Sequence, residues 1–358
     1  MADIHSNASS DDLVIARPQG LYCPPGDFWI DPWQPVDHAL ITHAHGDHLR
    51  AGNARYLASE ASRHVIEARV GAVDLQTLPY GQTLVHHGVT ISFHPAGHVL
   101  GSAQIRLEHG GRTWVVSGDY KTGPDRTCVP FEPVRCDVFI TESTFGLPVF
   151  RWAPQEAVFD DINAWWRANV EAGRASIVYA YSFGKAQRVL SGLDPAIAPI
   201  VVHGAVATMT DAYRRTGVAL PDTLRVDDAS PEVLRRCLVV APPSAQGSAW
   251  TRRFGDASDA FASGWMQLRG ARRRRNVDRG FVLSDHADWP GLLEAIAASG
   301  APRVIVTHGC AEPLVRFLGD QGLDAGAFKT AYGDDEEARE AAASAEEAPL
   351  AAAGEEPA

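Results

Sequence analysis

Residues 42–48 read Thr-His-Ala-His-Gly-Asp-His, and this stretch decides how the rest of the chain is interpreted. It brings together three imidazoles and one carboxylate, from His43, His45, His48 and Asp47. Neutral imidazole nitrogen and carboxylate oxygen are the ligands that a borderline divalent ion such as Zn²⁺ takes. If the apolar residues 39–42 form a buried strand, the loop after it directs two of these side chains to one ion and two to another. The alternative is a solvated, histidine-rich loop.

Length and composition indicate a globular protein of one large or two moderate domains. The chain has 358 residues, 45% of them hydrophobic, which is enough to bury a substantial core. No stretch reaches the apolar length of a membrane span, and residues 1–10 lack a basic region and an apolar signal segment. The five cysteines are scattered and form no C-x-x-C pair, which indicates reduced thiols. We therefore expect a cytoplasmic protein without membrane association.

The net charge of −12 is distributed unevenly along the sequence. Residues 334–358 hold nine acidic residues and one arginine and have little aromatic or β-branched content, so we expect a disordered acidic tail. A basic segment precedes it, with Arg269 and Arg279 on either side of Arg272, Arg273, Arg274 and Arg275. Its functional interpretation is phosphate neutralisation, and the alternative is a solvated surface.

Apolar β-branched runs alternate with helix-like segments, which predicts an α/β architecture with layered sheets. Expected strands cover residues 39–42, 89–93, 103–107, 113–117, 137–141, 176–180, 200–202, 238–241, 281–284 and 304–307. Expected helices cover residues 154–170, 186–190, 209–215, 289–298 and 312–319. Between residues 146 and 275 the only histidine is His203, so we predict an inserted domain there, with residues 1–145 and 276–333 forming one discontinuous domain.

Further candidate ligands follow expected strands or lie in glycine-rich loops. His98 stands in Ala-Gly-His-Val-Leu-Gly-Ser, Asp119 follows Ser-Gly, and His308 stands in Thr-His-Gly. A carboxylate such as Asp119 can bridge two ions about 3.5–4 Å apart. Taken singly, each has a structural alternative as a turn residue or a hydrogen-bonded core histidine.

With these motifs in place, the chain resembles the metallo-β-lactamase fold nucleases that carry a β-CASP insertion, over nearly all of residues 20–333. The matching motifs include Asp31 of Ile-Asp, Glu142 of Thr-Glu-Ser-Thr and His286 of Ser-Asp-His-Ala-Asp, besides those above. The resemblance implies an αββα sandwich with an inserted β-CASP α/β domain. A closer similarity, to bacterial ligase-associated DNA exonucleases that are also described as mRNA 3′-end processing factors, rests on residues 181–188, the arginine run and residues 281–289.

The resemblance also implies how the site residues divide between two divalent ions, with Zn²⁺ expected and Mn²⁺ the alternative. One ion is assigned to His43, His45, His98 and Asp119, and the other to Asp47, His48, Asp119 and His308. Such ions lower the pKa of bound water toward about 7 and stabilise charge on an attacked phosphate.

Three further residues have supporting roles by the same resemblance. Asp31 would orient a ligand histidine, and Glu142 would hold His286. His286 would bind phosphate or protonate the leaving oxygen, because imidazole titrates near physiological pH. The alternative for Asp31 and Glu142 is a structural role, since Asp31 precedes Pro32 and can simply shape a turn.

Lys185 follows Gly184 at an expected helix start, so it and Ser182 are candidates for holding a substrate phosphate together with the four consecutive arginines. The resulting hypothesis is a DNA exonuclease that acts from the 5′ end in repair and is associated with a DNA ligase. A histidine at the position of His308 is common among RNA-processing members of the superfamily, so an RNA nuclease is the alternative. A catalytically silent scaffold that binds nucleic acid is the alternative of another class.

Overall fold

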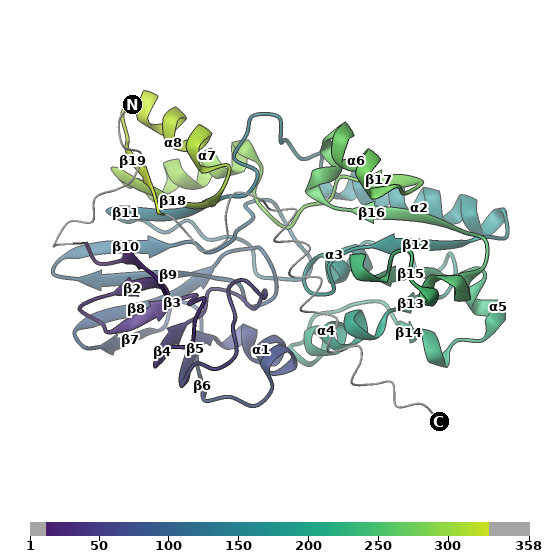
Figure 1. The fold of residues 1–358 in the computed structure, drawn as a ribbon, viewed down its shortest axis with the longest axis horizontal. Coiled ribbons are helices and arrows are strands. Elements are labelled where there is room, and N and C mark those ends of the chain that lie inside the picture. The colour runs from purple at the N-terminus through teal and green to yellow at the C-terminus, as the bar shows by residue number, and fades with distance from the viewer. Residues whose placement is uncertain (1–11, 329–358) are drawn as a thin grey trace. The chain divides into compact units, whose positions relative to one another are not determined.

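The computed structural model describes residues 12–328, which separate into two compact units (Figure 1). Within the described chain, one unit holds residues 12–151 and 286–328 and the other holds residues 152–285. The domain boundaries expected from the sequence, at residues 145/146 and 275/276, stay a prediction. The predicted acidic tail, residues 334–358, lies outside the described residues.

Two sheets form the first unit. The six-stranded sheet follows chain order, with β1 (Ile15–Arg17), β2 (Gly20–Cys23), β3 (Phe28–Ile30), β4 (His38–Leu40), β5 (Arg55–Ser59) and β6 (Leu75–Leu78). The seven-stranded sheet has the order β19 (Asp324–Ala327), β18 (Arg303–Gly309), β11 (Val138–Ser143), β10 (Arg112–Val116), β9 (Ala103–His109), β8 (Val89–Pro95) and β7 (Thr83–His86). The helices of this unit are η1 (Glu60–Ser62), α1 (Arg63–Val70), α7 (Trp289–Ser299) and α8 (Ala311–Asp320).

The seven-stranded sheet combines parts of the chain from before and after the second unit. In β11, Ile140 pairs in parallel with Val116 of β10 on one side and with Ile305 of β18 on the other. Figure 1 shows the late strand β18 beside the much earlier β11. The insertion therefore interrupts the sequence of this sheet without interrupting its hydrogen bonding.

The core of the first unit lies between its two sheets. Phe28 and Leu57 from the six-stranded sheet are buried in one cluster with Phe93, Trp114 and Ile305 from the seven-stranded sheet. The opposite face of the seven-stranded sheet is covered by α7 and α8, which contribute the cluster of Trp289, Ile296, Leu314, Val315 and Leu318. Helix α7 has clear boundaries, since Asp288 accepts the backbone N–H of Gly291 at its start and Gly300 is left-handed at its end.

The second unit contains one parallel sheet with helices on both faces. The strand order is β14 (Leu224–Arg225), β13 (Ile200–Val202), β15 (Leu238–Ala241), β12 (Ala175–Tyr179), β16 (Ala257–Ala262) and β17 (Arg279–Phe281). Its helices are α2 (Gln155–Glu171), α3 (Lys185–Ser191), α4 (Gly204–Arg215), α5 (Pro231–Leu234) and α6 (Arg269–Arg275), with the short turns η2 (Val226–Asp228), η3 (Pro243–Ala245), η4 (Ala249–Phe254) and η5 (Gly264–Gln267).

Alternating residues of these strands supply two cores. Val178 packs on the face covered by α2, α3 and α4, whereas Ile177 and Tyr179 pack on the opposite face. Helix α2 packs its apolar side on the same face of the sheet as Val178, with the spacing of an amphipathic helix. The buried residues of this side include Phe159, Ile162, Trp165 and Trp166. Burial of both faces explains why these strands read as continuous apolar runs.

The expected α/β architecture is confirmed, and each expected strand and helix has a counterpart in the structure. The strand expected at residues 281–284 is displaced, because β17 ends at Phe281. None of the helices in residues 12–328 combines the length and the apolar character that crossing a membrane requires.

Candidate metal centre

The candidate ligands of the first unit lie just beyond, or at the end of, its strands. Strand β4 ends at Leu40 and is followed by the His43–His48 loop, and β10 ends at Val116 shortly before Asp119. His98 lies in the loop between β8 and β9, and His308 lies near the end of β18. Strands of two different sheets therefore supply side chains that are far apart in the sequence.

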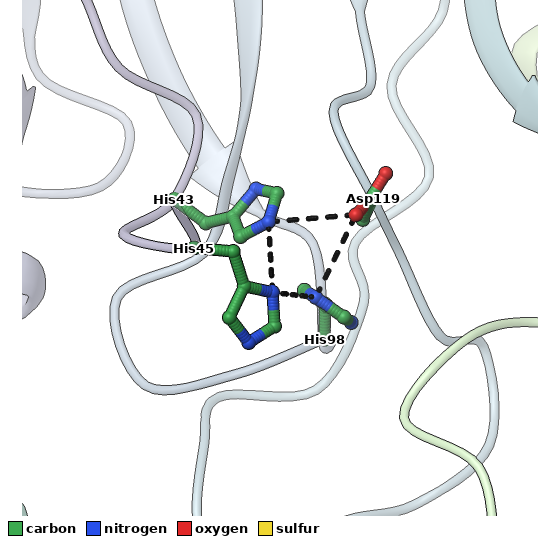
Figure 2. Close-up of side chains that lie close together, drawn as sticks. All are labelled: His43, His45, His98 and Asp119. Atoms are coloured by element: carbon green, nitrogen blue, oxygen red, sulfur yellow. Dashed lines mark hydrogen bonds and ion pairs between the residues drawn. The ribbon is translucent and has the colours of Figure 1, made fainter. Parts of the chain in front are cut away.

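The first group consists of His43, His45, His98 and Asp119 (Figure 2). His45 Nδ1 lies 3.1 Å from His43 Nε2 and 3.0 Å from His98 Nε2. Asp119 Oδ2 lies 3.4 Å from His43 Nε2 and 3.8 Å from His98 Nε2. Four potential ligand atoms, three nitrogens and one oxygen, thus converge on one point.

The second group shares Asp119 with the first. It consists of His48, Asp119 and His308. Asp119 Oδ1 lies 2.8 Å from His308 Nε2, and Asp119 Oδ2 lies 3.5 Å from His48 Nε2. Asp47 approaches the same imidazole, with its Oδ2 3.7 Å from His48 Nε2. The carboxylate of Asp119 therefore faces both groups, and its role as a bridge between two ions stays a prediction.

The spacing of the first group fits a tetrahedral metal ion. A nitrogen-bound Zn²⁺ with bonds of about 2.0–2.1 Å has ligand atoms about 3.3 Å apart, because they lie along the edges of a tetrahedron. The four contacts between its ligand atoms range from 3.0 Å to 3.8 Å. Imidazole nitrogens and a carboxylate are also the donor set that divalent transition metals prefer.

Burial and mutual repulsion act on His43. Burial is the main cause that lowers its pKa well below the ordinary value for imidazole, and the neighbouring His48 lowers it further. His43 is therefore held in the neutral form, whose ring nitrogen can bind a metal ion.

The carboxylates have the opposite effect on His48. Burial alone would lower its pKa, but Asp119, Asp47 and Asp31 together raise it well above the ordinary value. Burial would likewise raise the pKa of Asp119, but the charges of His48 and His308 hold it well below the usual range. An excess of negative charge thus surrounds the second group, which favours a bound cation.

Asp31 contacts the ring nitrogen of His48 that does not face Asp119. Its Oδ2 lies 2.7 Å from His48 Nδ1, and its two oxygens accept the Thr42 backbone N–H at 2.8 Å and hydroxyl at 2.5 Å. Asp31 also has a left-handed backbone, with φ 44°. The residue therefore has a turn conformation and contacts an imidazole, and its role in orienting a ligand histidine stays a prediction.

Glu142 and His286 form a second polar pair beside the ligands. Both Glu142 oxygens approach His286 Nδ1, at 3.0 Å and 3.1 Å. Glu142 is buried and accepts the backbone N–H of Tyr120 at 2.7 Å. The backbone carbonyl of Tyr120 in turn accepts the N–H of Ala287 at 2.7 Å. Glu142 and His286 thus lie together, as the sequence predicted, while their catalytic roles stay predictions.

Comparison with known proteins gives relatives of two kinds. The chain is 33% identical over 314 residues to a probable DNA ligase of Opitutus terrae, which covers 86% of this chain and 30% of that protein. It is 29% identical over 147 residues to an RNase J-like protein of Methanocaldococcus jannaschii, covering 37% of this chain and 34% of the relative. It is 30% identical over 122 residues to cleavage and polyadenylation specificity factor subunit 3 of Dictyostelium discoideum, covering 34% and 16%.

The chain belongs to the metallo-β-lactamase/β-CASP family. No family model matches the sequence. A solved structure of a protein of unknown function from Enterococcus faecalis superposes with a TM-score of 0.54 at 10% identity, covering 75% of this chain and 74% of that one. The predicted αββα sandwich with an inserted β-CASP α/β domain is confirmed as the fold class.

This metallo-β-lactamase/β-CASP chain spans about a third or less of the length of the curated relatives named above. The family implies divalent metal ions, and the two groups of ligand side chains fit them.

Hydroxyl groups are part of the site, and their roles were missed from the sequence. Thr42 Oγ1 contacts His43 Nδ1 at 3.1 Å, and Thr307 Oγ1 contacts His308 Nδ1 at 2.9 Å. Ser102 Oγ accepts the backbone N–H of His98 at 3.1 Å. The repeated Thr-His dipeptide was the available signal, because a hydroxyl next to a ligand histidine can fix the orientation of its ring.

The predicted substrate-binding residues of the β-CASP unit fall into two environments. Ser182 and Lys185 are buried, and the Lys185 ammonium group lies 3.1 Å from Asp285 Oδ1. Arg272, Arg273 and Arg274 are exposed on α6, whereas Arg275 is partly covered and stacks on the Phe261 ring at 4.4 Å. Their roles in binding substrate stay predictions.

Proposed function

We propose that this protein is a metal-dependent nuclease that degrades DNA from the 5′ end as part of repair, in association with a DNA ligase, in the cytoplasm. The observation that carries the proposal is Asp119, whose two oxygens face two groups of imidazoles in a chain of the metallo-β-lactamase/β-CASP family. Hydrolysis of a phosphodiester bond requires a nucleophile, stabilisation of the developing charge and a proton donor for the leaving group. The described residues offer a candidate for each.

The ligand side chains would hold two Zn²⁺ ions. His43, His45 and His98 would hold one ion, His48 and His308 would hold the other with Asp47 as an added ligand, and Asp119 would serve both. When bound, the ions supply a water of lowered pKa and stabilise charge on the attacked phosphate. Asp31 would accept a hydrogen bond from the Nδ1–H of His48, which leaves the lone pair of His48 Nε2 for the metal.

His286 would act on the leaving group. The Glu142 carboxylate would accept a hydrogen bond from the Nδ1–H of His286 and so orient the imidazole. The His286 Nε2 atom is then available to hold a phosphate oxygen or to give its proton to the departing hydroxyl. The imidazole is 13% exposed, whereas Glu142 is fully buried, so substrate meets the histidine and not the carboxylate.

The choice of DNA over RNA follows the extent of similarity. The relative named probable DNA ligase matches 86% of this chain, and the similar region fills only 30% of that relative, which leaves room for the ligase that its name describes. The relatives named for RNA processing match 34–37% of the chain. RNA is the second candidate, because those relatives include several named endoribonuclease.

The exposed arginines of α6 give the β-CASP unit a basic surface. The helix carries Arg269 and the run that ends at Arg275, and Asn276 follows it in a left-handed conformation. Neutralising phosphates releases counterions, so binding through this surface should weaken as salt rises. We assign these side chains to the nucleic-acid backbone and not to bases.

A matched cleavage assay tests the proposal. The purified chain, loaded with Zn²⁺ or Mn²⁺, is incubated with single-stranded DNA and with RNA of the same sequence, each labelled at either end, and Asp119→Ala is the control. Metal-dependent shortening of DNA from the 5′ end that the variant lacks supports the proposal. Preference for RNA would replace it with RNA processing, and absence of cleavage together with absence of bound metal would favour a binding scaffold.

A further inference from the structure

The β-CASP unit holds a buried ion pair that the proposed reaction does not use. Lys185 Nζ lies 3.1 Å from Asp285 Oδ1, and their side chains are only 6% and 3% exposed. The ammonium group also lies 4.8 Å from the centre of the Tyr181 ring. By contrast, both side chains of the Arg225–Asp211 ion pair in the same unit are more than half exposed. Lys185 therefore forms a buried ion pair inside its own unit.

One turn further along α3, a second cation is directed at the same segment. The guanidinium group of Arg188 donates to the backbone carbonyl of Ser284 at 2.7 Å, and Arg188 is 1% exposed. Two buried cationic side chains of the seven-residue helix α3 thus contact the consecutive residues Ser284 and Asp285, about a hundred positions later in the chain.

Strand order explains how these segments meet. Helix α3 follows the carboxyl end of β12, and residues 284–285 follow the carboxyl end of β17. In the parallel sheet, β16 lies between these two strands, so their carboxyl ends share one edge. The edge of a parallel sheet where strands end is where such folds place functional side chains.

The residue after Asp285 is His286, and the boundary between the two units falls between them. On the far side of that bond, Glu142 holds the His286 ring and the Tyr120 carbonyl holds the Ala287 N–H. Four consecutive residues, 284–287, are therefore each fixed by a separate contact. A segment held this closely on both sides of a functional histidine leaves its backbone little freedom.

We infer that Lys185 and Arg188 are positioning residues, which fix Ser284 and Asp285 so that the His286 imidazole is held at the distance from substrate that its reaction needs. This inference rests on the proposed function for its kinetic consequence, but the placement of the imidazole can be measured without it. A buried ion pair is weak evidence for stability, since replacing it with apolar residues is often neutral, and we therefore assign this one to fixing a conformation.

The test uses a double variant, Lys185→Met with Asp285→Asn, which removes both charges and so leaves no uncompensated buried charge. Lys185→Arg keeps the charge pair and is the conservative variant. Arg225→Met removes an exposed ion pair of the same unit and is the matched control. Arg188→Lys is an independent second variant, because it shortens the donor to Ser284.

Two measurements are made on the full chain. The first is the nitrogen–proton spectrum of the histidine side chains, with and without Zn²⁺, in which His286→Gln identifies the His286 signal. The second is the cleavage rate, separated into kcat and KM across pH, with the zinc content determined alongside. A 1 Å displacement of a reacting group can reduce a rate by about 100-fold, so a fall in kcat of at least about tenfold is expected in the double variant.

The inference predicts a shifted or broadened His286 signal in the double variant and in Arg188→Lys, with kcat lowered at near-normal KM and zinc content. Lys185→Arg should restore most of the rate, and Arg225→Met should behave as the unaltered protein. An unchanged His286 signal in a folded variant, with or without a loss of thermal stability, overturns it. If the unaltered protein cleaves neither DNA nor RNA, the proposed function fails, while the imidazole spectrum still decides the positioning role.

Discussion

Replacing Asp31 with asparagine separates the two roles that the structure gives this residue. Asparagine tolerates the left-handed backbone, φ 44°, and can still accept from the Thr42 N–H, so the turn is kept. The amide nitrogen, placed where Oδ2 stood, donates to His48 Nδ1 instead of accepting from it. His48 must then carry its proton on Nε2, the atom that faces Asp119, and that proton blocks the metal.

The size of the effect follows from the contact that is lost. The Asp31–His48 hydrogen bond is 2.7 Å long and involves a carboxylate, and such bonds contribute about 1.5–3 kcal/mol. At about 1.4 kcal/mol for each factor of ten, the affinity for the ion of the second group should fall roughly 10- to 100-fold. The first group does not contain His48 and is linked to Asp31 through the Thr42 hydroxyl, so the affinity for its ion should fall less.

Competition titration with a chromogenic chelator measures the two affinities separately. Asp27→Asn is the matched control, because Asp27 is also left-handed, with φ 52°, and its carboxylate accepts the hydroxyl of Tyr22 at 2.7 Å. The control should bind both ions normally. Equal affinity of Asp31→Asn and the unaltered chain for the second ion would refute the reasoning and leave Asp31 as a turn residue.

Four further outcomes are expected. Asp119→Ala should lower cleavage by more than about 100-fold and reduce bound metal below two ions per chain, as measured by activity and elemental analysis. Because the pKa of His48 is raised, protons compete with the metal ion at pH values above the usual pKa of imidazole. The apparent affinity for the second ion should therefore fall as the pH is lowered through that raised pKa and recover above it, which metal titrations at several pH values measure. Gly309→Ala should destabilise the fold by more than about 1 kcal/mol in urea unfolding, because Gly309 has φ 82° and a Cβ there would lie 2.4 Å from the Ser143 backbone. Trp166→Ala should cost about 3–5 kcal/mol in the same assay, since Trp166 is fully buried.

Much of the site was predictable because strand ends can be recognised locally. An apolar, β-branched run such as residues 304–307 predicts a buried strand, and the polar residue that follows it, His308, is then expected at the end of that strand. The strands of the six-stranded sheet were largely missed, because β1 and β3 have three residues each and carry little periodic signal.

The partners of buried charges could not be predicted from the sequence. Lys185 looked like a phosphate ligand because Gly184 precedes it, and nothing near it in the sequence points to Asp285. The pairing depends on strand order in the parallel sheet, which places β12 and β17 one strand apart. Long-range order of this kind is set by the whole fold and not by local propensity.

The parallel pairing of β11 with β18 has a consequence for biosynthesis. Translation delivers β11 first, then the whole β-CASP unit, and only then β18 with His308. A nascent chain that has emerged as far as β17 can fold its parallel sheet but lacks a neighbour for one edge of β11 and lacks the last metal ligand. The order of the strands therefore delays assembly of the candidate metal centre until β18 has left the ribosome, so that a chain interrupted before β18 lacks one of the metal-binding side chains.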